Sequence, residues 1–205
     1  MFWDRIAGVY DIYVNVINRK THRTLCRIVS GLIDPEDEVL ECACGTGMLS
    51  KVTAAKCRHL TATDFSEGML KKARKNCAKY SNIIFEQADI NVLPYRDGSF
   101  DKVIAGNVIH LLQDPLQALR ELERVCRTNG KLIIPTYMNK EKPTRFVKLT
   151  DHAGADFKQQ FTAASYRQFF LDAGYSSVQI IPADGFIPCA VAVMTKKERT
   201  EHESI

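Results

Sequence analysis

The chain has 205 residues, a length that suits one well-buried domain and is short for two. Apolar residues make up 45% of it and charged residues 25%, the proportions of an ordinary soluble globular protein. The net charge of +4 is small and the basic residues are scattered, which argues against a nucleic-acid-binding protein.

The N-terminus and the cysteines predict a cytoplasmic location. Asp4 and Arg5 interrupt the N-terminus, so we expect no signal peptide, and no apolar run approaches the roughly 18 residues of a membrane span. Seven cysteines, an odd number, lie mostly inside predicted elements, which indicates reduced thiols. Cys42 and Cys44 have no second Cys or His pair nearby, so we predict small buried side chains there and no metal site.

The first two predicted elements are helices. Residues 2–18 are aromatic-rich and repeat their apolar side chains with a helical period, which predicts a helix packed on the domain. An amphipathic helix on a membrane surface is the second choice, because few basic residues precede Arg19 and Lys20. Residues 21–32 form the second predicted helix, which ends near Gly31.

Residues 39–56 predict a strand, a glycine-rich turn and a helix. Gly45 and Gly47 allow a tight turn and a close approach of a ligand, and the crevice beyond the strand ends of such sheets is where ligands bind. The third glycine of a dinucleotide fingerprint is missing, because Ser50 stands there. Glu41 precedes the turn and would repel a pyrophosphate but suit a cationic ligand.

A second strand, at residues 59–64, ends at Asp64, 17 residues after Gly47. This is close to the spacing at which an acid meets a ribose, and one carboxylate can accept hydrogen bonds from both hydroxyls. The alternative is that Asp64 only begins a turn. Ser66 is a predicted N-cap for the following helix, with Met69 on its inner side.

The remaining elements alternate between strands and helices. Strands are predicted at residues 83–85, 102–105 and 131–136, and a helix starts at Pro115. A helix at residues 162–173 is followed by strands at 177–181 and 186–194, joined by a turn at 182–185.

Four stretches resemble one enzyme family. Residues 39–49 resemble the acid-x-G-x-G-x-G motif of class I S-adenosylmethionine (AdoMet) methyltransferases, with Ala43 in place of the first glycine. Residues 2–11 resemble the F-D-x-I-A…Y-D opening of the ubiquinone/menaquinone C-methyltransferases. Residues 89–101 resemble their D-x-x-x-L-P-F-x-D-x-S-F-D segment, and residues 109–115 their L-H-x-L-x-D-P segment.

The resemblance implies one α/β domain over residues 1–205, a Rossmann-like, mostly parallel seven-stranded sheet with helices on both faces and an antiparallel last strand. Within it we expect a helical lid (1–32), an AdoMet-binding core (37–137), a substrate-side loop, helix and hairpin (138–194) and a charged tail (195–205). The expected cofactor-binding residues are Tyr10, Glu41, Cys42, Ala43, Cys44, Gly45, Gly47, Asp64, Phe65, Met69, Ala88, Asp89, Ile90 and Asn107.

The implied reaction is methyl transfer from AdoMet to an O, N, S or C atom of a small molecule, with S-adenosylhomocysteine as product. His110 follows the fourth strand and is a candidate general base, with a packing role as an equal alternative. The rival functions are a non-catalytic binding or scaffold protein of this fold and, less favoured, a nicotinamide-dependent oxidoreductase. We expect a monomer or homodimer.

Overall fold

The computed structural model describes residues 18–138 and 160–197. The predicted helix over residues 2–18, and with it Tyr10, therefore lies outside the described residues except for Asn18. The same holds for most of the expected substrate-side loop and for the end of the charged tail. Among the described helices, none is both long and apolar enough to cross a bilayer.

The described residues form one seven-stranded sheet, with the strand order β3-β2-β1-β4-β5-β7-β6. The pairs from β3 to β5 are parallel, and β7 runs antiparallel to both β5 and β6, which confirms the expected fold class. The strands are β1 (Glu38–Cys42), β2 (His59–Asp64), β3 (Ile83–Gln87), β4 (Phe100–Ala105), β5 (Cys126–Tyr137), β6 (Gln179–Ala183) and β7 (Cys189–Thr195).

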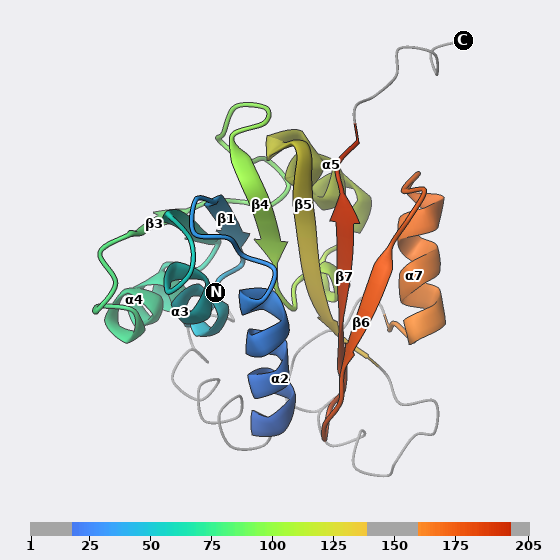
Figure 1. Cartoon of the computed structure of the whole chain (residues 1–205), viewed down its shortest axis with the longest axis horizontal. Helices are drawn as coiled ribbons and strands as arrows, with labels where there is room; N and C mark the ends of the chain where they lie inside the picture. Colours follow the sequence, from blue (N-terminus) through green and yellow to red (C-terminus); the bar gives the residue numbers. More distant parts are fainter. Residues whose placement is uncertain (1–17, 139–159, 198–205) are drawn as a thin grey trace.

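Helices cover both faces of the sheet (Figure 1). Successive strand residues point to opposite faces, so in β5 Leu132 and Ile134 pack with α5 and α7, whereas Ile133 packs with α2, α3 and α4. Both faces are apolar because both are covered. The helices are α2 (Arg19–Ser30), α3 (Met48–Ala54), α4 (Glu67–Asn76), α5 (Pro115–Val125), α7 (Ala163–Asp172) and the short 3₁₀ helix η2 (Ile109–Leu111).

The helix starts follow the capping residues in the sequence. The Ser66 hydroxyl accepts the amide of Met69 at the start of α4, as predicted. The Asp114 carboxylate accepts the amide of Gln117 at the start of α5, which has Pro115 in its first turn. These caps fix the first residues of α4 and α5. Both helices begin near the edge of the sheet where the parallel strands have their carboxyl ends.

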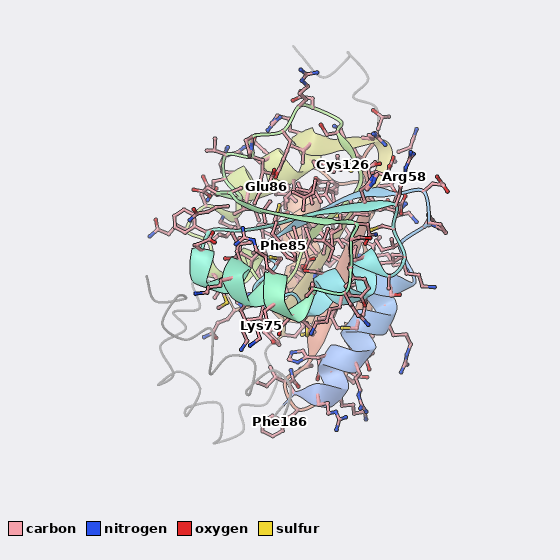
Figure 2. All side chains as sticks on the ribbon, turned by 90° about the vertical axis from the view of Figure 1, so that its left-hand side faces the viewer. Arg58, Lys75, Phe85, Glu86, Cys126 and Phe186 are labelled. Atoms are coloured by element: carbon pink, nitrogen blue, oxygen red, sulfur yellow. The ribbon has the colours of Figure 1, made fainter. Side chains whose placement is uncertain are left out.

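Several predicted strand boundaries were wrong, the largest difference being in β5. This strand begins at Cys126, five residues before Lys131, because Cys126 pairs with Phe100 and the amide of Asn129 donates to the carbonyl of Lys196. The turn predicted at residues 182–185 begins later, because Pro182 and Ala183 are paired with β7. Figure 2 shows Phe186, in the actual turn, beside the lower end of α2.

Candidate functional site

A small hollow, partly open to solvent, lies at the carboxyl ends of β1, β4 and β5. This edge of the sheet is where open α/β sheets bind ligands. Five of its lining residues were predicted from the sequence: Glu41, Ala43, Cys44, Gly45 and Asn107. Six were not: His22, Thr46, Met48, Leu49, Gly106 and Tyr137.

The glycine turn forms the floor of the hollow. Gly45 and Gly47 have positive φ angles of 56° and 86°. A Cβ on Gly45 would meet nothing within 4 Å, whereas a Cβ on Gly47 would lie 2.8 Å from the sulfur of Cys77. Gly45 therefore leaves room for a ligand, and Gly47 leaves room for the packing of α4. Ala43 also has a positive φ, 53°, which is the left-handed conformation that glycine adopts without strain.

Glu41 is a buried carboxyl group at the end of β1. Its side chain is 2% exposed, and Oε2 has no hydrogen-bond partner among the described residues. Burial raises the pKa of Glu41 from 4.5 to about 8. A buried carboxyl group with an unsatisfied oxygen is suited to a cationic ligand, because the ion pair would lower that pKa again.

Asp64 joins two turns at the end of β2. One carboxylate oxygen accepts the amide of Gly45 at 2.8 Å, and the other accepts the amide of Ser66 at 2.9 Å. Asp64 thus begins a turn, as the alternative reading proposed. A carboxylate has about four acceptor positions, so these two amides do not exhaust its capacity for ribose hydroxyls. Phe65, the next residue, is 52% exposed.

The expected residues after β3 lie beside the hollow and do not line it. The amide of Ala88 donates to the carbonyl of Asp64, which ties the ends of β2 and β3 together. The carboxylate of Asp89 accepts the amide and side chain of Asn91, and Ile90 is buried in the core. The structure gives these residues a loop-shaping role.

Two other predicted residues are also part of the packing. Met69 is buried under α4, and its amide serves the Ser66 cap. Cys42 is buried, and burial raises the pKa of its thiol to about 12, so the thiol is unreactive. No cluster of three or more potential metal ligands occurs in the described part of the chain.

His110 lies behind the hollow. It is 3% exposed on η2 and is absent from the lining of the hollow. Burial lowers the pKa of its imidazole to about 4. Its ring stands edge-on to the ring of Tyr137, with centroids 6.0 Å apart. This geometry favours the packing role over the base role.

Asn107 is the predicted residue that lines the hollow from the loop after β4. It has a positive φ of 53°, and its amide donates to the carbonyl of Pro135 at 2.8 Å. This bond holds the loop after β4 against β5. The side chain of Asn107 is near the thiol of Cys189, which donates to its Oδ1 at 3.8 Å.

His22 and Tyr137 are lining residues that sequence reasoning missed. Tyr137 ends β5, so its position was available from the strand order once β5 was placed. His22 lies on α2, and the periodicity of the apolar residues in this helix does not predict that the histidine points toward the hollow. Asn18 sets this orientation, because its side chain exchanges two hydrogen bonds with the backbone of Ile187.

The comparisons with known proteins agree with this geometry. Residues 40–134 match the family described as a methyltransferase domain. The chain is 32% identical over 137 residues to a demethylmenaquinone methyltransferase of Renibacterium salmoninarum, covering 66% of this chain and 56% of the relative. It is 34% identical over 138 residues to a ubiquinone/menaquinone biosynthesis C-methyltransferase of Bdellovibrio bacteriovorus, covering 64% of this chain and 58% of the relative.

A solved structure supports the fold independently. The S-adenosylmethionine-dependent methyltransferase of Thermotoga maritima, described as a possible histamine N-methyltransferase, superposes with a TM-score of 0.74. The superposition covers 96% of this chain and 99% of that one at 22% identity, which shows the fold alone. The chain spans little more than half the length of the two curated relatives.

Proposed function

We propose that this chain, which by family and fold is a class I AdoMet-dependent methyltransferase, transfers the methyl group of AdoMet to a small-molecule acceptor. The observation that carries the proposal is the buried carboxyl group of Glu41, which has an unsatisfied oxygen beside the glycine turn of the matched domain. AdoMet is a cation at its sulfonium and ammonium groups, so its charge suits that oxygen.

The residues present fit this cofactor. Glu41 would hold the cationic end, and Asp64 would accept the ribose hydroxyls from the position where it already fixes Gly45. Gly45 leaves the backbone open to close approach. The exposed ring of Phe65 is suited to cover an adenine. Bound AdoMet supplies an activated methyl group, so the protein has to align the acceptor and exclude water.

The other expected site residues receive smaller roles. We infer that Ala43, Cys44 and Gly47 contribute backbone geometry, and that Cys42 and Met69 support the site from the core. Ala88, Asp89 and Ile90 would border the adenine end through the loop after β3. Asn107 would face the methyl group, and His110 would pack behind it. The proposal for Tyr10 concerns a residue outside the described ones.

A quinol ring is the acceptor to test first. The two curated relatives are named for demethylmenaquinone and for ubiquinone and menaquinone biosynthesis. The hollow adds Met48, Leu49 and Tyr137, apolar and aromatic surface suited to a flat ring. We also infer a cytoplasmic location, because all seven cysteines are free thiols. A monomer or homodimer remains our proposal for the assembly.

Two assays test the proposal and its rivals. S-adenosylhomocysteine should raise the melting temperature and NAD should not, since only a ligand of the native state stabilises it. Methylation is then measured with labelled AdoMet and a panel of quinols, phenols, amines and thiols. Stabilisation by NAD alone would contradict the cofactor assignment. Tight AdoMet binding with no methylation of any acceptor would favour the non-catalytic binding protein.

A further inference from the structure

The hollow contains a hydrogen-bonded pair that cofactor binding does not require. Nε2 of His22, on α2, lies 2.8 Å from the hydroxyl oxygen of Tyr137, the last residue of β5. Both side chains line the hollow together with Glu41 and Asn107. Both also lie outside residues 40–134, the part of the chain that matches the methyltransferase-domain family. The pair therefore lies in the same hollow as the proposed cofactor-binding residues.

The turn between β6 and β7 holds the start of α2, and with it His22, in place. The side-chain amide of Asn18 donates to the carbonyl of Ile187 at 2.9 Å, and its oxygen accepts the amide of Ile187 at 3.1 Å. The same oxygen accepts the hydroxyl of Thr21, the residue before His22, at 2.7 Å. The two bonds to Ile187 thus fix the first turn of α2 against the turn between β6 and β7. Such fixed geometry is what a catalytic group needs.

Tyr137 is also held in place. Its backbone pairs with Cys189 of β7, and the ring of His110 packs against its edge. The titratable groups around the pair are Glu41 from β1, Cys44 from the glycine turn and His110 from η2. Burial raises the pKa of the two acids and lowers that of His110, so each tends to stay neutral near pH 7.

We propose that Tyr137 and His22 form the general base that removes a proton from the acceptor, an inference that rests on the proposed methyl transfer. Tyr137 is the catalytic residue, because it lines the hollow and its hydroxyl is bonded to His22. His22 positions that hydroxyl and receives its proton at Nε2, in the tautomer that carries the ring proton on Nδ1. The acceptor is of the class that must lose a proton to react, a hydroxyl group or the ring carbon of a quinol.

The step balances without a further reactant. The oxygen of Tyr137 takes the acceptor's proton while its own proton passes to Nε2 of His22. The acceptor atom forms a bond to the methyl carbon as the bond from that carbon to sulfur breaks, and the sulfur keeps the electron pair. The products are the methylated acceptor, S-adenosylhomocysteine and the protonated imidazole of His22, which returns its proton to solvent before the next turnover.

The test compares two acceptor probes in the full chain. Reduced 1,4-naphthoquinone has hydroxyl groups that must be deprotonated, whereas thiophenolate is already an anion at alkaline pH and needs no base. Single-turnover methylation of each is measured at saturating AdoMet over about pH 6 to 9 for wild type, Tyr137→Phe and His22→Gln. Glutamine preserves the hydrogen bond to Tyr137 but cannot take up its proton. A positioned base contributes about 10²–10⁴-fold, so both variants should lose that much rate on the quinol and none on the thiophenolate.

Two matched variants control for chemistry elsewhere. Tyr95→Phe removes a hydroxyl bonded to Glu86, and His59→Gln changes an imidazole bonded to Glu38; neither residue lines the hollow. Both should methylate the quinol at the wild-type rate. Affinity for S-adenosylhomocysteine, measured by calorimetry, should be the same in all five proteins. In wild type the quinol rate should fall as the pH falls and the pair becomes protonated, a dependence that both base variants should lack.

Each other result overturns a stated part. A His22→Gln enzyme with the wild-type quinol rate and pH profile would leave His22 no role in proton transfer. An equal loss on both probes would make the pair a shape element only. If wild type binds AdoMet and methylates neither probe, the acceptor-side role of the pair is wrong. If AdoMet does not bind at all, it is the proposed function that fails.

Discussion

The amide of Gly45 donates a 2.8 Å hydrogen bond to the carboxylate of Asp64, so the glycine turn after β1 is fixed by the residue that ends β2. The other oxygen of the same carboxylate accepts the amide of Ser66, which caps α4. Asp64 is therefore both a part of the turn and a candidate ribose acceptor. Its substitution should change stability and cofactor affinity together.

Replacing Asp64 with alanine should lower the free energy of unfolding and weaken AdoMet binding by about ten- to a hundredfold, because a hydrogen bond to a charged group contributes about 1.5–3 kcal/mol. Asp64→Asn retains one carbonyl oxygen and should lie between alanine and wild type in both quantities. Urea unfolding and calorimetric titration measure the two effects. A folded alanine variant with unchanged affinity would leave Asp64 as a turn residue only.

The raised pKa of Glu41 predicts how stability depends on pH. Between its ordinary 4.5 and about 8, the unfolded chain has lost this proton and the folded chain retains it. The unfolded state then binds fewer protons, so this group makes stability fall as pH rises, by up to about 1.4 kcal/mol per pH unit. Glu41→Gln should remove that slope and should be the more stable protein at pH 8.

The same group should release a proton when AdoMet binds, because the cation favours the ionised carboxylate. Calorimetry at pH 6.5 in two buffers with different ionisation enthalpies counts the released protons. Wild type should release a measurable fraction of a proton and Glu41→Gln should release less, with weaker binding. Equal proton release by the two proteins would place the ionisation elsewhere.

His110 has the opposite effect on stability. Burial lowers its pKa from 6.5 to about 4, so between these values the unfolded state binds more protons than the folded state. Its contribution is present above pH 6.5 and is lost as the pH falls toward 4. His110→Phe should flatten this part of the urea-midpoint profile and leave methylation close to wild type. A loss of rate comparable to that of Tyr137→Phe would return His110 to the catalytic list.

The two turn glycines make a matched pair of alanine substitutions. Gly47→Ala meets the sulfur of Cys77 at 2.8 Å as well as a strained φ of 86°, so it should lower the melting temperature more than Gly45→Ala does. Gly45→Ala meets nothing within 4 Å in the structure, so its larger effect should be on AdoMet binding. Equal effects of the two variants on binding would contradict the open role of Gly45.

Local signals in the sequence were enough to predict the elements around the glycine turn. The seven-stranded, mostly parallel sheet was expected from the resemblance to the methyltransferases, and the observed sheet confirms it. Capping residues placed the starts of α4 and α5, and the acids that end β1 and β2 were identified from their spacing to Gly45 and Gly47. Each of these signals lies within about 30 residues of the chain, the size of one βαβ unit.

The part of the hollow lined by His22 and Tyr137 could not be predicted in this way. His22 reaches the hollow only because Asn18 binds Ile187, a contact between residues 169 positions apart. His110 was a candidate because it follows β4. Whether its side chain points into the hollow or into the core depends on how η2 packs against the rest of the domain. The burial that gives it a pKa of about 4 comes from elements distant in sequence. No local pattern contains that information.

The contact between Asn18 and Ile187 also bears on the order of assembly during synthesis. The chain emerges from the ribosome with its N-terminus first, and the glycine turn and the strands around it can pair long before residue 187 exists. Helix α2, which carries His22, can be fixed in this position only after the hairpin of β6 and β7 has been made. A chain that ends before β7 would lack the antiparallel partner of β5, and one that ends before residue 187 would also lack the partner of Asn18. In such a chain the glycine turn could form, but His22 and Tyr137 would not be held in place beside it.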